Sequence, residues 1–187
     1  MNKVLQTDST YGKVVRGKLF HNWSTTQMLV FASIMAALAS LLQAAGGYIP
    51  VFGFAISPFT TLPICIATIM FFRYGLFSYV LTIFLLLLLE PMELFIFPFT
   101  TGLLGITLGW SLTFFRQRII IISLNSVVLF LGICLPLLVL QFPVFGPMTA
   151  ENQSLIILVV IYLFSFIYAV LWYFLAIFSI NKLVSFF

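Results

Sequence analysis

The run SLIILVVIYLFSFIYAVLWYFLAIFSI, residues 154–180, contains no charged residue in 27 positions. A helix needs about 20 mostly apolar residues to cross a bilayer, so this run is long enough to span one. Over the whole chain of 187 residues, 63% are apolar and only 6% are charged, where soluble domains carry about 25% charged residues. So few charges cannot cover a water-soluble surface, which excludes a soluble enzyme, a nucleic-acid-binding domain and a disordered protein. The sequence predicts an all-α polytopic membrane protein.

Apolar runs divide the chain into six predicted spanning helices. They cover residues 25–45, 57–72, 76–90, 94–115, 119–140 and 154–180. A capping box of Ser24 and Gln27 is expected to start the first helix, and the pair Gly46-Gly47 to end it. Residues 1–24 then form a cytoplasmic or interfacial tail, and residues 25–187 form one domain, a six-transmembrane-helix bundle.

The distribution of charge supports this division. With both termini in the cytoplasm, all eight basic residues fall on the cytoplasmic side, as the positive-inside rule requires: Lys3, Lys13, Arg16, Lys18, Arg73, Arg116, Arg118 and Lys182. Glu90, Glu93 and Glu151 fall outside. Residues 11–23 mix basic and apolar side chains, so they form either a short amphipathic helix on the anionic inner leaflet or a disordered tail anchored by Trp23.

Overlapping pairs of small residues mark the first predicted helix. These pairs lie four positions apart, which lets another helix approach closely: Ala32/Ala36, Ser33/Ala37 and Ala36/Ser40. The row either packs within the bundle or docks the chain onto a different membrane protein.

A row of glycines marks the predicted helix 94–115. Gly102, Gly105 and Gly109 are expected to pack this helix within the bundle. Thr100 and Thr101 precede the row. Their hydroxyls are expected either to bond back to the helix or to line a cavity.

Polar side chains near the predicted outer ends of the helices are candidates for a ligand site. Acidic side chains cost roughly 2.5–3.5 kcal/mol at the membrane centre, so the two glutamates of Glu90-Pro-Met-Glu93 should lie near the outer surface, in a solvated turn or in a pocket. The uncharged connection 43–54 has three glycines and three aromatic residues and is expected to form a flap over an apolar outer face. The candidate ligand residues are Gln43, Tyr48, Glu90, Glu93, Gln141, Asn152, Tyr162 and Ser165.

The sequence lacks the side-chain sets that membrane enzymes use. No intramembrane Ser/His, Asp/Asp or His/Glu combination and no Walker motif is present, so we expect a non-enzymatic protein without metal or cofactor. Cys65 and Cys134 lie in apolar runs, so we expect them to be small buried hydrophobic residues.

These features together resemble the substrate-binding S components of energy-coupling factor (ECF) vitamin transporters. The likeness in architecture covers residues 25–182: a chain near 190 residues, six helices, a cytoplasmic N-terminus and a hydrophobic connection between the first two helices. The motifs that carry it are Ala32-x-x-x-Ala36, Leu62-Pro63, Tyr74-Gly75, Glu90-Pro91, Thr101-Gly102-Leu103-Leu104-Gly105 and Gly109.

The resemblance implies a multi-pass protein of a bacterial cell membrane that binds a vitamin or precursor in its outer half. Such a protein docks through Ala32 and Ala36, with Ser33 and Ser40 beside them, onto a T transmembrane protein held by two ATPase subunits. It then topples in the membrane and releases the ligand inside. Because no Lys or Arg lies on the predicted outer side, a neutral or cationic ligand is favoured over an anionic one. The rod-shape protein of the MreD type resembles the same topology, so a scaffold of the cell-wall machinery is the alternative function.

Overall fold

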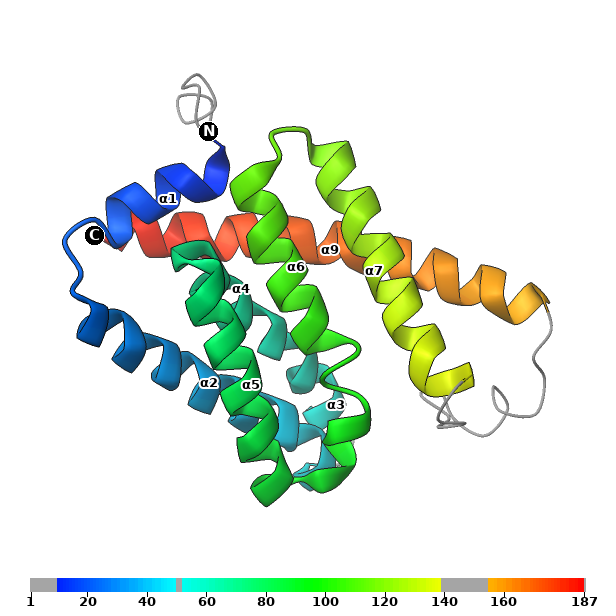
Figure 1. The fold of residues 1–187 in the computed structure, drawn as a ribbon. Coiled ribbons are helices and arrows are strands. Elements are labelled where there is room, and N and C mark those ends of the chain that lie inside the picture. The colour runs from blue at the N-terminus through cyan, green and yellow to red at the C-terminus, as the bar shows by residue number, and fades with distance from the viewer. Residues whose placement is uncertain (1–9, 50–51, 139–154, 187) are drawn as a thin grey trace.

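The computed structural model describes residues 10–49, 52–138 and 155–186. Within these residues every regular element is a helix, which confirms the all-α prediction (Figure 1). The α-helices are α1 (Tyr11–Leu19), α2 (Thr25–Tyr48), α3 (Phe52–Ile56), α4 (Thr61–Met70), α5 (Phe72–Leu89), α6 (Thr101–Phe114), α7 (Arg118–Leu138) and α9 (Leu155–Phe186). Two short 3-10 helices, η2 (Ser57–Thr60) and η3 (Pro91–Phe95), lie between them.

Four of these helices, α2, α5, α7 and α9, are long and apolar enough to cross a membrane. Large apolar side chains such as Leu88, Ile119 and Ile156 are exposed on them, as a lipid-facing surface requires. Residues 57–70 and helix α6 are apolar but shorter. The chain is therefore a multi-pass membrane protein, as predicted. The number of six membrane-spanning helices and the cytoplasmic position of both termini stay predictions.

Helix α2 begins where predicted but ends later. Ser24 caps it: the Gln27 N–H donates to Ser24 Oγ at 3.3 Å, and the Ser24 N–H donates to Gln27 Oε1 at 2.8 Å. The helix continues through Gly46 and Gly47 to Tyr48, so the expectation that the glycines end it is wrong. Residues 43–48 of the expected flap are also the last turns of this helix. The glycines make room for acidic side chains, because a Cβ at Gly47 would lie 2.7 Å from Glu90 Cδ.

Two other predicted helices are interrupted. The predicted helix 57–72 starts as η2 and ends at Phe71, whose extended backbone (φ −161°, ψ 143°) separates α4 from α5. The predicted helix 94–115 begins only at Thr101. Pro91 opens η3, and Pro98 follows it in the turn. A proline has no N–H to donate to a helix interior, so a continuous helix over this segment is disfavoured.

Helix α6 packs against α4 through the predicted glycine row. A Cβ at Gly105 would lie 2.8 Å from Ile64 Cβ, and one at Gly109 would lie 2.6 Å from the Cys65 carbonyl oxygen. These glycines let the two backbones approach, which confirms the packing prediction for this row. Both cysteines are buried and free.

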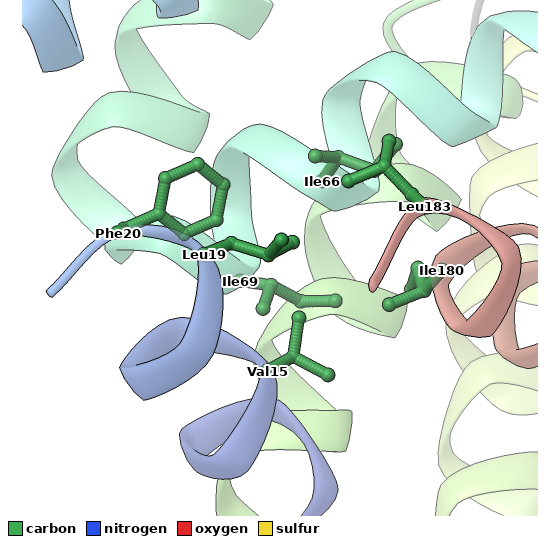
Figure 2. Close-up of a pocket in the computed structure, with 7 residues that line it drawn as sticks. All are labelled: Val15, Leu19, Phe20, Ile66, Ile69, Ile180 and Leu183. Carbon is green, nitrogen blue, oxygen red and sulfur yellow. The ribbon is translucent and has the colours of Figure 1, made fainter. Parts of the chain in front are cut away.

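Helix α1 lies across one end of the bundle, beside the C-terminal part of α9 (Figure 1). Thr10 Oγ1 donates to the Thr113 carbonyl at the end of α6, and Tyr11 Oη donates to Asn181 Oδ1 of α9 at 3.0 Å. Of the two alternatives predicted for residues 11–23, the structure therefore shows the helix, and the apolar face of this helix packs on the protein. Figure 2 shows the gap beneath it, which is entirely apolar and holds only about 10 Å³. That volume is too small and too apolar to bind a ligand.

Candidate functional site

Gln43, on the penultimate turn of α2, is the centre of a buried polar network. Its side chain is 1% exposed. Its Nε2 donates to Glu93 Oε2 at 2.8 Å, and its Oε1 accepts a hydrogen bond from Thr101 Oγ1, also at 2.8 Å. The network therefore joins α2, η3 and the first residue of α6.

Glu93 is only 7% exposed, although it belongs to the short η3 turn between two longer helices. Burial raises the pKa of this carboxyl above its ordinary value of 4.5, because a charged group loses solvation there. The hydrogen bond from Gln43 opposes this change in pKa, and the nearby charge of Glu90 adds to it. The Gln43 amide is therefore the group that stabilises the ionised form of this carboxyl.

Two further predicted ligand residues lie next to this network. Glu90 is half-buried, and its carboxyl lies against Gly47 in the last turn of α2. Tyr48 is 64% exposed, and its Oη donates to the Leu89 carbonyl at 2.5 Å. The structure therefore brings together Gln43, Tyr48, Glu90 and Glu93.

The other predicted ligand residues lie elsewhere. Tyr162, exposed on α9, packs its ring edge-on to Phe130 at 5.7 Å. Ser165 is buried and donates to the Ile161 carbonyl of its own helix at 2.8 Å. Neither side chain joins the network around Gln43. Gln141 and Asn152 lie outside the described residues.

A cavity of about 180 Å³ lies between η2, α6, α7 and α9. Its lining consists of Pro58, Ile96, Thr100, Thr101, Leu129, Ile133, Phe164 and Tyr168. Thr101 belongs both to this wall and to the network of Gln43. Thr100 lines the cavity, as one of the two alternatives expected, and its hydroxyl donates to the Ile96 carbonyl in the turn before α6 at 2.8 Å.

The cavity is suited to a small aromatic molecule. The rings of Phe164 and Tyr168 stack with their centroids 5.5 Å apart. No charged side chain is among its lining residues. Ligand pockets for drug-sized molecules usually measure about 300–1,000 Å³, so this smaller cavity fits little more than one ring. Within the described ranges, no group of three or more His, Cys, Asp and Glu could hold a metal ion.

The buried members of the small-residue row of α2 pack within the bundle, whereas Ala37 is exposed. Ala32 and Ala36 are fully buried and Ser40 nearly so, and Thr82 Oγ1 of α5 donates to the Ala36 carbonyl at 3.3 Å. Ser33 is half-buried and bonds back to its own helix. These contacts correspond to packing within the bundle. A docking role for these residues stays a prediction, and it would require α5 to move away from this face.

Asn125 is a buried polar residue that the sequence analysis did not single out. Its Oδ1 accepts from Thr107 at 2.8 Å, and its Nδ2 donates to Ser111 Oγ at 2.9 Å and to the Ile121 carbonyl at 2.7 Å. A lone Asn in a spanning helix usually bonds to a neighbouring helix, so the sequence could have predicted a helix contact at Asn125. Every polar atom of this side chain is used, so Asn125 ties α6 to α7.

The chain matches no protein-family model, no curated protein and no solved structure. Its class is therefore defined by its own fold, that of an all-α, multi-pass membrane protein. Its most developed candidate site is the buried Gln43 network beside the cavity of α6, α7 and α9.

Proposed function

We propose that this protein is a non-enzymatic binding subunit that captures a small molecule within the membrane, in the manner of the S components it resembles. The observation that carries the proposal is the chain Glu93–Gln43–Thr101, which connects a buried carboxyl to a cavity wall. Burying a carboxyl is costly unless it is paired, so such groups concentrate at functional sites.

The network reaches the largely apolar wall of the cavity through Thr101. Glu93 Oε2 accepts a hydrogen bond from the Gln43 amide N–H, which leaves the amide oxygen of Gln43 as an acceptor. The Thr101 hydroxyl donates its hydrogen bond to this amide oxygen, so the Thr101 hydroxyl oxygen is left as an acceptor. A ligand that donates an N–H to this oxygen and stacks on Tyr168 fits the site. We therefore propose a neutral or cationic heteroaromatic ligand, such as a pyridine or pyrimidine vitamer.

The proposal includes delivery by partner subunits. Because the sequence has no Walker motif, the energy for uptake would come from two ATPase subunits through a T transmembrane protein. These partners are implied by the resemblance alone. Since α5 covers Ala32 and Ala36, docking is expected to use another face of the chain or a rearranged α5.

Native mass spectrometry of the full-length protein, purified from its own membrane, tests the proposal. We expect a retained small molecule together with T and ATPase subunits. A complex with cell-wall morphogenesis proteins and no small molecule would instead favour the scaffold function of the MreD type.

A panel of pyridine and pyrimidine vitamers then tests the site by ligand-induced change in melting temperature. A vitamer is expected to raise the melting temperature of the wild type but not of the Thr101→Val variant. Thr68→Val is the matched control, because the Thr68 hydroxyl bonds only to its own helix and does not line the cavity. Equal stabilisation of both variants would contradict the role of Thr101.

A further inference from the structure

Two arginines from different helices converge on Phe71, the residue that separates α4 from α5. The Arg16 guanidinium carbon lies 4.8 Å from the centroid of this ring. The Arg73 guanidinium carbon lies 5.8 Å from the same centroid and 4.7 Å from that of Tyr74. Arg73 also donates to Tyr74 Oη at 3.0 Å. Arginine stacks readily on aromatic rings, and here the rings hold both guanidinium groups in place.

The described part of the chain supplies no carboxylate for these arginines. Its acidic residues, Glu90 and Glu93, follow the last residue of α5, whereas Arg73 lies in the first turn of that helix. Eighteen residues of helix separate the two ends by about 27 Å. Two cations within 6 Å of the same ring centroid, with no counter-charge among the described residues, repel each other, so an anion that contacts both would be stabilised.

The arginines lie at one end of α5, a helix long and apolar enough to cross a membrane. Arg73 is exposed one residue after the start of the apolar spanning helix α5. At the same end, Phe20, Trp23 and Phe31 form an aromatic cluster with ring centroids 5.0–5.5 Å apart. Aromatic residues of this kind collect at the membrane–water interface, where the lipid phosphates lie.

Next to Arg73, the outward face of α5 is apolar and exposed. Phe72 is 50% exposed, and Leu76 is 44% exposed one turn further along the helix. A free anion in water would not require such a surface, whereas the acyl chain of a lipid would lie along it. The charge and the apolar face together favour a lipid as the occupant.

We propose that Arg16 and Arg73 form a binding site for the phosphate of an anionic phospholipid, whose acyl chain lies along Phe72 and Leu76. Arginine suits this ligand because its planar guanidinium can donate two parallel hydrogen bonds to phosphate oxygens. The site also ties α1 to the start of α5 through the shared headgroup. This proposal does not depend on the ligand site of Gln43.

The test uses the full-length protein in nanodiscs with equal amounts of phosphatidylglycerol and phosphatidylcholine. Native mass spectrometry measures the ratio of the two lipids that remain bound. The wild type is expected to prefer phosphatidylglycerol. The double variant Arg16→Gln/Arg73→Gln should lose roughly ten-fold or more of this preference, because each cation near the surface raises the affinity for anionic lipid several-fold. The control Arg118→Gln/Lys182→Gln removes the same charge from exposed positions elsewhere and should keep the preference.

An absent preference in the wild type would overturn the proposal, as would an equal loss in the control, which would indicate a general charge effect. Displacement of bound phosphatidylglycerol by inorganic phosphate would also overturn it and assign the arginines to a free anion. If the double variant unfolds, the single variant Arg73→Gln, with its melting temperature as a check of folding, provides the same comparison.

Discussion

Replacement of Ala36 by leucine separates the two interpretations of the small-residue row on α2. The Ala36 side chain is 0% exposed, and its carbonyl receives a hydrogen bond from Thr82 of α5. Because Ala36 is fully buried and lines neither of the two cavities, the added carbon atoms would press on the helices packed against this face. The leucine would therefore push α5 away from α2.

Overpacking of this kind costs about 1–3 kcal/mol. For chains of this length, 1 kcal/mol corresponds to about 2–4 °C in melting temperature. We therefore expect Ala36→Leu to lower the melting temperature of the isolated protein by about 2–12 °C. Intrinsic-fluorescence thermal unfolding in detergent measures this change without any partner protein.

The matched control is Ala37→Leu, because Ala37 is the next residue on the same helix and is exposed. It should leave the melting temperature almost unchanged. The reasoning would be refuted if Ala36→Leu kept the wild-type melting temperature but lost its complex with a partner membrane protein. That result would mean that Ala36 docks a partner.

Two further predictions concern the buried glutamate and the glycine row. The folded protein binds the Glu93 proton more tightly than the unfolded chain does, because burial raises the pKa of this carboxyl above 4.5. The contribution of Glu93 to stability is thus greatest below its unfolded pKa and declines as pH rises through the folded pKa. Melting curves from pH 4.5 upward should show a decline that is weaker in Glu93→Gln, and identical slopes would contradict the assignment. Gly109→Ala should lower the melting temperature, because its Cβ would lie 2.6 Å from the Cys65 carbonyl oxygen. The control is Gly17→Ala, because a Cβ at Gly17 meets no atom within 4 Å. This control should be neutral or should stabilise the protein by up to about 1 kcal/mol. Equal melting temperatures for these two variants would count against close packing of α6 on α4.

Local features of the sequence determined the class of the protein and many of its elements. Apolar composition and run length predicted a multi-pass helical membrane protein, and the residues of α2, α5, α7 and α9 meet that expectation. The cap at Ser24 and the close packing at Gly105 and Gly109 were also predictable. Each of these features depends on residues within a few turns of one another, or on the size of one side chain.

The positions of glycines between helices were less informative. A glycine pair such as Gly46-Gly47 is compatible both with the end of a helix and with the close approach of another side chain. The tertiary structure shows close approach, because the side chains of Glu90 and Glu93 lie against that turn of α2. By contrast, Pro91 and Pro98 are local signals that disfavour a continuous helix over this segment, and α6 accordingly begins only at Thr101.

Only the tertiary structure decided which polar residues meet and which faces are covered. Gln43 bonds to Glu93 and Thr101, which lie 50 and 58 positions away in the chain, and no local pattern encodes such a pairing. The row at Ala36 has the same sequence whether its neighbour is α5 or another protein, because small residues permit close approach without selecting a partner. Burial of that face by α5 depends on how the helices pack around one another, which is a property of the whole chain.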